Sequence, residues 1–416
     1  MPSAPAHRVD SEAVEAANVL VVGAGQAGLA LSHELSARGV EHLVLERGRV
    51  GQSWRDRWDS FCLVTPNWSM QLPGGAYDGP DPDGYLPRDE IVEFFERYAV
   101  RIRAPVRDGM TVTSIISEPS GGFRLSTTDG EVHAGRVALA TGAYQRPHRP
   151  FAETLPPGLH VIDVSDYRRP DGLPAGGILI IGSGQSGLQI AEELHHAGRD
   201  VVLSCGRAPW APRRIGGRDL VWWAARNGFF EVPAGALPNP AERLTANLQN
   251  SGRDGGHDLN YRTLKALNVA LVGRFIGAAD ADLRFGDDLA ASVAFGDQRY
   301  RTFMGLTQRY AAEQGLEVPD APEPPAFDAS APERLPASRF STVIYAGGFR
   351  PAYRDWLPID GALDDLGFPI HVDGESVAVP GLHFIGVHFL RKRKSSLLIG
   401  VGEDAAVVAD RMALAG

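Results

Sequence analysis

Two short apolar runs, each ending in a glycine-rich turn, dominate the hydrophobic pattern of the chain. The first spans residues 19–28 with the sequence VLVVGAGQAG, and the second spans residues 178–187 with the sequence ILIIGSGQSG. Four consecutive apolar residues without polar alternation are typical of a strand buried on both faces of a parallel sheet. The G-x-G-x-x-G spacing then predicts a tight turn into a helix. We therefore expect two strand-turn-helix units of the same kind.

Each turn is expected to hold a dinucleotide. The first glycine permits the sharp turn, the second lets a pyrophosphate approach the backbone, and the third lets helix and strand pack closely. The helix N-terminus offers free N–H groups to the phosphates. Two dinucleotides on one chain predict electron transfer between them. The expected contact residues are Gly23, Gly25, Gln26, Ala27 and Gly28 in the first turn, and Gly182, Gly184, Gln185, Ser186 and Gly187 in the second.

The pattern predicts further helices and strands around these turns. Helical periodicity continues from the turns to about residues 39 and 197, and it recurs over residues 88–101 and 396–412. Apolar or alternating runs predict strands at residues 42–45, 111–115, 123–125, 136–140, 201–204, 342–346 and 382–385. These elements predict an α/β fold with two Rossmann-like dinucleotide-binding domains.

The second domain is expected to be inserted into the first, because the last strand needs a sheet to join and nothing after residue 340 would form a domain alone. Residues 18–168 and 338–416 are assigned to the first domain, and residues 169–316 to the second. Residues 317–337 are rich in proline and acidic residues and are expected to form an exposed linker. Residues 1–17 are expected to be a flexible arm.

Composition narrows the class of protein. The 416 residues carry a formal net charge of -10, which argues against nucleic acid as a partner. No apolar run approaches the roughly 18 residues of a membrane span, and the N-terminus lacks the apolar core of a signal peptide. The only cysteines, Cys62 and Cys205, form no C-x-x-C pair. We therefore expect a cytoplasmic protein without membrane association, metal site or redox-active C-x-x-C disulfide.

Two charged residues follow the strands next to the glycine turns. Glu46 comes eighteen residues after Gly28, where an acidic side chain accepts the hydroxyls of an adenosine ribose. The alternative is a solvated strand end. Arg207 follows the strand at residues 201–204, which no acidic residue ends, and a guanidinium there suits the 2′-phosphate of NADPH. The alternative is that this region, with Arg213, Arg214 and Arg218, is an exposed loop cluster.

These motifs resemble those of the flavoproteins with two dinucleotide-binding domains, and more narrowly the class B flavin-dependent monooxygenases. Within that class the chain is similar to flavin-containing monooxygenases and plant indole-3-pyruvate monooxygenases. The resemblance covers roughly residues 18–220 and 338–412, and it implies FAD in the first site and NADPH in the second. Besides the first glycine turn and Glu46, it implies FAD contacts from Arg47, Gln52, Ser53, Trp54, Val112 (through its main chain), Thr141, Gly142 and Gly386.

The resemblance also implies a reaction. Asn67 lies where flavin-containing monooxygenases carry an asparagine that faces the flavin and the nicotinamide; the alternative is a turn asparagine after Pro66. FAD reduced by NADPH would form a C4a-(hydro)peroxyflavin with O₂. This adduct would oxygenate a small soft nucleophile such as an amine, a thioether or an activated carbon. The partners are then O₂ and a small-molecule substrate, and a homodimer is left open.

Two departures from the family pattern leave alternatives open. Asp163 stands where an F-x-G-x-x-x-H-type fingerprint would place histidine, and Gln52 stands where a second glycine is common. Baeyer–Villiger-type oxidation, oxidative decarboxylation of the indole-3-pyruvate kind, and a flavin reductase or electron-transfer flavoprotein remain alternatives. The basic run at residues 391–394 is either a solvated loop or a partner for NADPH phosphates or an anionic substrate.

Overall fold

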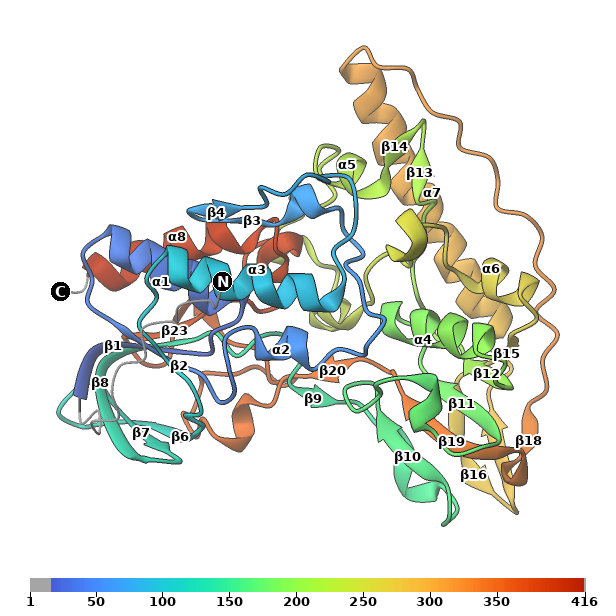
Figure 1. Ribbon diagram of the computed structural model, residues 1–416, viewed down its shortest axis with the longest axis horizontal. Helices are drawn as coiled ribbons and strands as arrows, with labels where there is room; N and C mark the ends of the chain where they lie inside the picture. The colour runs from blue at the N-terminus through green and yellow to red at the C-terminus, as the bar shows by residue number, and fades with distance from the viewer. Residues whose placement is uncertain (1–15, 415–416) are drawn as a thin grey trace, which may run out of the picture.

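The computed structural model describes residues 16–414 of the chain. The predicted flexible arm at residues 1–17 therefore lies almost wholly outside the described residues. Figure 1 shows two lobes: one contains the first and last helices of the described chain, and the other is built from its middle.

The first lobe is built on a nine-stranded sheet. Its parallel strands have the order β23-β8-β1-β2-β5, and the Val19, Leu20 and Val21 side chains of the central β1 are fully buried. This burial explains the unbroken apolar run in the sequence. The parallel strands are β1 (Ala16–Val22), β2 (Leu43–Leu45), β5 (Val106–Arg107), β8 (Gly130–Leu139) and β23 (Leu382–Phe384). Antiparallel pairing adds β6 (Val112–Ser117), β7 (Phe123–Thr127), β21 (His371–Val372) and β22 (Glu375–Ser376).

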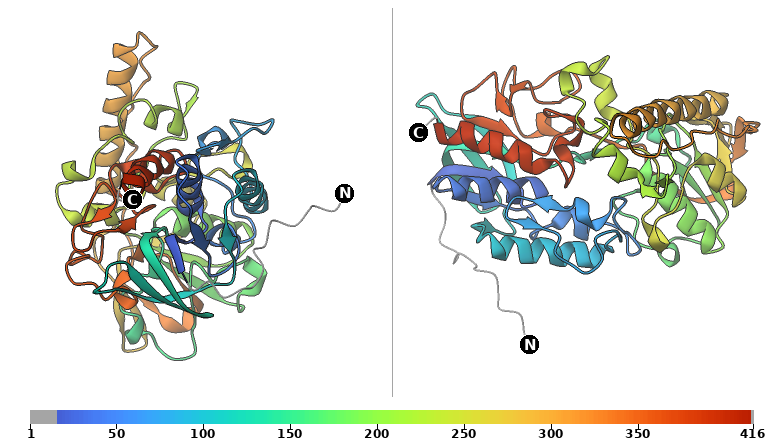
Figure 2. Two further views of the ribbon diagram at one scale, coloured as in Figure 1. Left: turned by 90° about the vertical axis from the view of Figure 1, so that its left-hand side faces the viewer. Right: turned by 90° about the horizontal axis from the view of Figure 1, so that it is seen from above.

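Three helices cover one face of this sheet: α1 (Gln26–Ala37), α3 (Arg88–Arg101) and α8 (Val401–Leu414). Figure 2 shows them side by side when the molecule is viewed from above. Helix α8 buries Val401, Ala405, Val408 and Met412, whose spacing of three to four residues places them on one face of a helix.

The second lobe contains a parallel sheet with the strand order β10-β19-β11-β12-β15. Helix α4 (Gln185–His196) follows β11, as the second glycine turn predicts. The strands are β10 (His160–Asp163), β11 (Gly177–Ile181), β12 (Val201–Ser204), β15 (Ala270–Val272) and β19 (Phe340–Tyr345). The α/β fold with two Rossmann-like units, the second inserted into the first, is thus confirmed.

The structure assigns two strands to a different domain from the one that the expected boundaries give them. Boundaries at residues 168 and 338 would assign β10 and β19 to the first domain, but both pair within the second sheet. The strand β19 lies beside β11 in the same way as β8 lies beside β1. Both strands end in an apolar run, and each is followed by an alanine, Ala140 or Ala346, and then a glycine turn. This likeness is why the sequence pattern could not assign β19 to its sheet.

A long helix that the pattern did not predict, α7 (Leu289–Glu313), flanks the second sheet. The expected linker then runs back beside it, as Figure 1 shows. The linker is held to the second lobe: the Tyr300 hydroxyl donates to the Pro322 carbonyl at 2.7 Å, and Arg262 Nη2 donates to the Pro325 carbonyl at 2.8 Å. Its end forms β18 (Arg334–Pro336), which pairs with β17 (Asp282–Phe285) beside β16 (Phe275–Ala279).

The last helix begins later than predicted. It starts at Val401, whereas the sequence placed its start near Ser396. Ser395 lies instead in a 3₁₀ turn, Arg393–Ser396, where its Oγ accepts hydrogen bonds of 3.0 Å from the backbone N–H groups of Arg391 and Lys392. Ser395 therefore stabilises the turn that precedes α8 and does not cap the helix itself.

The remaining elements are short and lie in the connections. They are α2 (Gln52–Arg55), β3 (Gln71–Leu72), β4 (Gly75–Ala76), β9 (Arg146–Pro147), β13 (Arg214–Ile215), β14 (Arg218–Asp219), α5 (Leu220–Ala224), α6 (Tyr261–Ala266) and β20 (Phe349–Arg350). No helix within residues 16–414 is both long and apolar enough to cross a membrane.

Candidate nucleotide-binding site

The first glycine turn, residues 23–28, forms the first cradle at the carboxyl end of β1, the edge where parallel sheets bind ligands. Helix α1 begins after Gly25, and no side chain in the described part of the chain caps it. The N–H groups of its first turn are therefore left for an anion. A Cβ on Gly25 would meet no heavy atom of residues 16–414 within 4 Å, whereas one on Gly28 would lie 1.8 Å from the Gly23 carbonyl oxygen. Open at Gly25 and tightly packed at Gly28, the turn fits a pyrophosphate.

Gln26 connects this cradle to two other segments. Its Nε2 donates to the Ser396 carbonyl at 3.1 Å, and its Oε1 accepts from Trp54 Nε1 at 3.2 Å. The Trp54 ring stacks on Phe95 of α3, with centroids 5.9 Å apart. The structure thereby brings together Gln26 and Trp54, two of the residues predicted to contact FAD.

The side chain of Glu46 is buried, with 6% exposure, so it is not a solvated strand end. Its Oε2 accepts from the Ala24 N–H at 2.7 Å, and its Oε1 accepts from the Gly48 N–H at 3.0 Å. A carboxylate oxygen accepts more than one hydrogen bond. These contacts orient Glu46 at the cradle and leave acceptor capacity for ribose hydroxyls.

The other predicted FAD residues on α2, β6 and nearby loops differ in exposure. Gln52 braces its own turn, accepting from the Arg49 N–H at 3.1 Å and donating to Asp56 at 2.8 Å. Arg47 and Ser53 are exposed, and Val112 is half-buried at the start of β6. Through its two hydrogen bonds Gln52 stabilises the turn in which it lies.

The ends of β8 and β23 complete this edge of the sheet. Thr141 Oγ1 accepts from Gln145 Nε2 at 3.0 Å, and the same amide group donates to the Gly142 carbonyl at 3.0 Å. Gly386 has φ +73°, and a Cβ there would lie 2.6 Å from the Cβ of Ala27. Gly386 is therefore required for the close approach of the β23 end to α1.

The second glycine turn, residues 182–187, forms the second cradle, and a loop lies against it. The Gln185 side chain bonds both backbone groups of Asn250, with Oε1 accepting from its N–H at 3.1 Å. A Cβ on Gly184 would lie 3.8 Å from the Cβ of Ala246. Gly182 and Gly187 are packed as tightly as Gly23 and Gly28 of the first cradle. Ser186 is half-buried. Residues 246–250 thus flank the space beside the second cradle.

The arginines after β12 differ in their surroundings. Arg207 is exposed and has no ion pair among residues 16–414; its Cζ lies 5.7 Å from the Phe295 ring. Arg213 is 1% exposed and pairs with Asp219 at 2.7 Å. The interpretation of these arginines as an exposed cluster is therefore wrong for Arg213, while Arg207 is free to meet a phosphate.

Asn67 is buried and holds its own loop. Its Nδ2 donates to the Asp81 carbonyl at 2.8 Å, and its Oδ1 accepts from the Leu86 N–H at 2.7 Å. It opens a 3₁₀ turn after Pro66, the turn role considered as the alternative. Its catalytic role stays a prediction.

Three residues that the sequence analysis missed meet at the carboxyl edge of the first sheet. The Arg57 Cζ lies 5.3 Å from the Tyr144 ring, and the Tyr144 and His388 rings lie 5.4 Å apart. Burial lowers the pKa of His388 to about 4, so its imidazole is neutral at neutral pH. Tyr144 and His388 each follow a predicted strand end by a few residues. That position at the ligand-binding edge was the signal that could have identified them.

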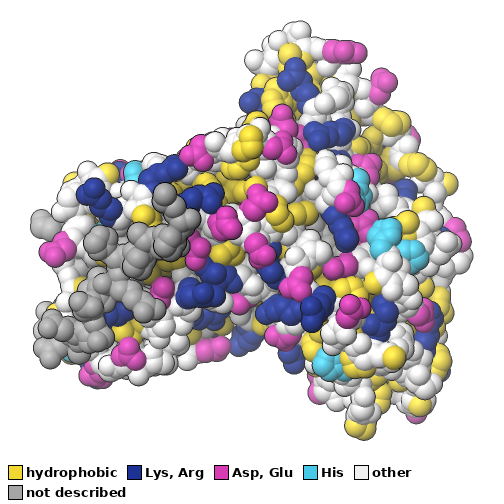
Figure 3. All heavy atoms as spheres, in the orientation of Figure 1, with side chains coloured by type: hydrophobic (Ala, Val, Ile, Leu, Met, Phe, Trp, Pro, Cys, Tyr) yellow, Lys and Arg dark blue, Asp and Glu magenta, His cyan; other side chains and the backbone are white. Residues whose placement is uncertain are grey.

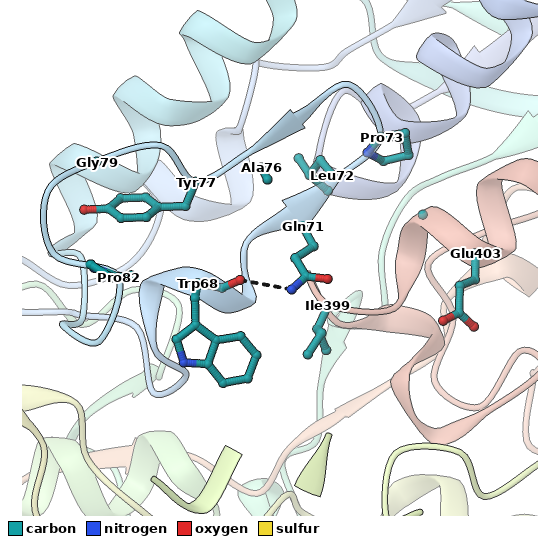
Figure 4. Close-up of a pocket in the computed structure, with 11 residues that line it drawn as sticks. Trp68, Gln71, Leu72, Pro73, Ala76, Tyr77, Gly79, Pro82, Ile399 and Glu403 are labelled. Atoms are coloured by element: carbon teal, nitrogen blue, oxygen red, sulfur yellow. Dashed lines mark hydrogen bonds between the residues drawn. The ribbon is translucent and has the colours of Figure 1, made fainter. Parts of the chain in front are cut away.

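A groove of about 470 Å³ opens between the β3–β4 hairpin and the start of α8. Figure 4 shows Trp68, Gln71 and Ile399 around its centre. Tyr77 lies at one end of the groove, and Glu403 of α8 lies at the opposite end. The Gln71 amide donates to the Trp68 carbonyl at 3.2 Å. Apolar and polar side chains both line the groove, and Trp68 in its lining follows Asn67 in sequence. Figure 3 shows acidic and basic side chains interspersed over the face of the molecule that Figure 1 presents, without one broad basic surface on that face.

Two Rossmann-like units, each with its own nucleotide cradle, form the fold of flavoproteins with two dinucleotide-binding domains. Solved structures that share it include a flavin-containing monooxygenase from Stenotrophomonas maltophilia, with 19% identity, a TM-score of 0.64, and 97% of this chain and 99% of that chain covered. Another is the bacillithiol disulfide reductase of Bacillus cereus, with 13% identity, a TM-score of 0.61, and 97% and 100% covered. At these identities the likeness concerns the fold alone.

Residues 20–217 match a family model described as pyridine nucleotide-disulphide oxidoreductase. An uncharacterized CzcO-like oxidoreductase of Geobacillus kaustophilus is 32% identical over 395 residues, which are 93% of this chain and 96% of that protein. The chain belongs to this family of CzcO-like oxidoreductases. It is also 30% identical to the indole-3-pyruvate monooxygenase YUCCA1 of Oryza sativa over 208 residues, 48% of this chain and 50% of that protein. The family resemblance inferred from the sequence motifs is thus confirmed.

Proposed function

We propose that the chain is an FAD- and NADPH-dependent monooxygenase that oxygenates a small soft nucleophile. The observation that carries the proposal is the pair of cradles, each at the carboxyl edge of its own parallel sheet and each with a helix N-terminus that no side chain of residues 16–414 caps. Bound FAD would supply the oxygen-activating chemistry, and NADPH would supply the electrons.

The residues of this chain would bind, orient and exclude water. Glu46 and the first cradle would hold the adenosine and pyrophosphate of FAD, and Gln26 with Trp54 would position the flavin end. Arg207 and the second cradle would hold NADPH. The groove beside Trp68 would take the apolar part of the substrate.

The cysteines argue against a reductase that works through a dithiol. Cys62 and Cys205 are both free and buried, and burial raises the pKa of Cys62 to about 11. A thiol with such a pKa is a poor thiolate nucleophile at neutral pH. A reductase that passes electrons onward without a dithiol remains the second candidate, because it would use the same two cradles.

Oxygen-isotope incorporation separates the two candidates. We expect a purified yellow protein that oxidises NADPH and transfers one atom of ¹⁸O₂ to an amine, thioether or indolic acid. NADPH oxidation that yields only H₂O₂ with every substrate class, together with rapid reduction of an added quinone, would favour the reductase.

Replacing Arg207 with alanine should raise the KM for NADPH by about tenfold or more and leave the KM for NADH nearly unchanged. The physical reason is that an exposed guanidinium, which no carboxylate of the described residues pairs, can form a charge-assisted bond to the 2′-phosphate, which NADH lacks. Steady-state kinetics with both nucleotides measure the effect, and Arg214→Ala is the matched control. Equal changes for both nucleotides would remove Arg207 from the phosphate site.

Replacing Asn67 with alanine should uncouple NADPH oxidation from product formation. The variant loses the bonds to Asp81 and Leu86 that hold the loop, and we expect more H₂O₂ for each NADPH consumed. Paired measurements of NADPH, H₂O₂ and product give the coupling ratio. A ratio like that of the unmodified enzyme would exclude Asn67 from oxygen chemistry.

A further inference from the structure

The basic run Arg391–Lys394 precedes α8, and three of its four side chains are neutralised by carboxylates. These three side chains are therefore ion-paired and partly exposed rather than free in solvent. The pairs are Arg391 with Asp373 and Asp404, and Lys392 and Lys394 each with Glu231 and Glu403.

Arg393 is the exception in this run. Its Cζ lies 4.3 Å from the ring centroid of Phe229 and 5.1 Å from that of Phe389. It has no ion pair within the described residues, and its buried Nε has no hydrogen-bond acceptor there. Burial lowers the pKa of Arg393, and the charge of Arg299 lowers it further. Glu242, which acts in the opposite direction, already accepts from Arg299 at 3.1 Å.

A guanidinium that lies over two aromatic rings still has its in-plane N–H groups to donate. The rings attract the charge, but they cannot accept the in-plane N–H groups. A buried donor without an acceptor is unfavourable, whereas the planar fork of an arginine matches the two oxygens of a carboxylate or phosphate. Arg393 is therefore positioned for an anion that the described chain does not supply.

The surroundings of Arg393 connect the first cradle with the groove. Ser396, three residues further on, accepts a hydrogen bond from Gln26 at the first cradle. Phe229 belongs to the same apolar cluster as Trp68 and Ile399, which line the groove in Figure 4. A ligand held at Arg393 would thus have an apolar surface and the flavin cradle nearby.

We propose that Arg393 binds the oxyanion of a small-molecule ligand, with the rings of Phe229 and Phe389 packed beside the guanidinium. The oxyanion is the carboxylate of the substrate or a phosphate of the nicotinamide dinucleotide. The first assignment rests on the proposed function and defines its substrate class as a carboxylate attached to an apolar body.

Ligand-dependent thermal unfolding of the FAD-loaded protein tests this proposal. The probes are phenylacetate, the neutral analogue phenylacetamide, and NADP⁺, at equal ionic strength. We expect phenylacetate or NADP⁺ to raise the melting temperature of the unmodified protein, and phenylacetamide not to do so. In Arg393→Met the apparent Kd of that anion should rise by about tenfold or more. Arg393→Gln repeats the test if the methionine variant fails to fold.

Lys392→Met is the matched control, because it removes one charge from the same run while Lys394 still pairs with both carboxylates. Loss of the phenylacetate response in the Arg393 variants assigns the substrate carboxylate, and loss of the NADP⁺ response assigns the phosphate. Equal responses in variant and unmodified protein, or no anion response in either, would overturn the proposal. The measurement needs no NADPH oxidation, so an anion-binding protein that oxygenates nothing contradicts only the proposed function.

Discussion

Replacing Gly28 with alanine is expected to give a colourless protein. The added Cβ would lie 1.8 Å from the Gly23 carbonyl oxygen and 3.3 Å from the Cβ of Ala140. The closest of these atoms is backbone, so α1 must move away from β1. Overpacking of this kind costs about 1–3 kcal/mol. It also displaces the N–H groups that would face the pyrophosphate. We expect FAD affinity to fall by about a hundredfold, as measured by flavin absorbance of the purified protein and by FAD titration.

The second cradle offers the matched variant. In Gly187→Ala the Cβ would lie 2.1 Å from the Gly182 carbonyl oxygen, so the same distortion occurs at the other nucleotide. This protein should stay yellow but no longer be bleached by NADPH. Gly305→Ala on α7 is the control for both, because its added Cβ would meet no described heavy atom within 4 Å outside its own stretch of helix. A Gly28→Ala protein with normal FAD affinity would show that the first turn is not the flavin cradle.

Replacing Arg213 with methionine is expected to destabilise the protein by about 3–5 kcal/mol, the cost of breaking a buried ion pair. Its Nη2 donates to Asp219 at 2.7 Å, its Nη1 to the Val64 carbonyl at 2.6 Å, and its Nε to the Tyr85 hydroxyl at 2.9 Å. Without Arg213, the buried carboxylate of Asp219 loses its main counter-charge. Urea denaturation followed by tryptophan fluorescence measures the loss.

The control for this variant lies next to it. Arg214 is 46% exposed and lies 3.5 Å from the same carboxylate, so Arg214→Met should cost no more than about 1 kcal/mol. Similar losses of unfolding free energy in Arg213→Met and Arg214→Met would mean that the buried hydrogen bonds of Arg213 stabilise the protein no more than the exposed ion pair of Arg214 does. Because Val64 and Tyr85 precede the second lobe in sequence and Arg213 belongs to it, we also expect the Arg213 variant to loosen the contact between the lobes.

The sequence predicted those parts of the fold that depend on neighbouring residues. The two glycine turns, Glu46 after β2, and the helix at residues 88–101 all follow from local spacing, and the structure has each of them. Helix α7 was missed because Gly296 and Gly305 lower its helical pattern. Gly296 serves packing instead: a Cβ there would lie 2.9 Å from Trp210.

Contacts between distant residues set the limit on prediction of the site. Arg213 resembled a solvated loop arginine because its partner Tyr85 lies 128 residues away. Arg57, Tyr144 and His388 come from three separate segments, and only the folded sheet brings them together. Arg393 could not be distinguished from Arg391, Lys392 and Lys394 in the sequence, because these three differ from it only in pairing with carboxylates that the fold brings close.

The position of β19 has a consequence for biosynthesis. This strand lies between β10 and β11, yet it is translated more than 150 residues after them. Until residue 345 has left the ribosome, both neighbours have an unpaired edge, which favours association between nascent chains. The first sheet also waits for its last strand, β23. Neither half can therefore mature by itself during translation, and the chain must complete both sheets almost together.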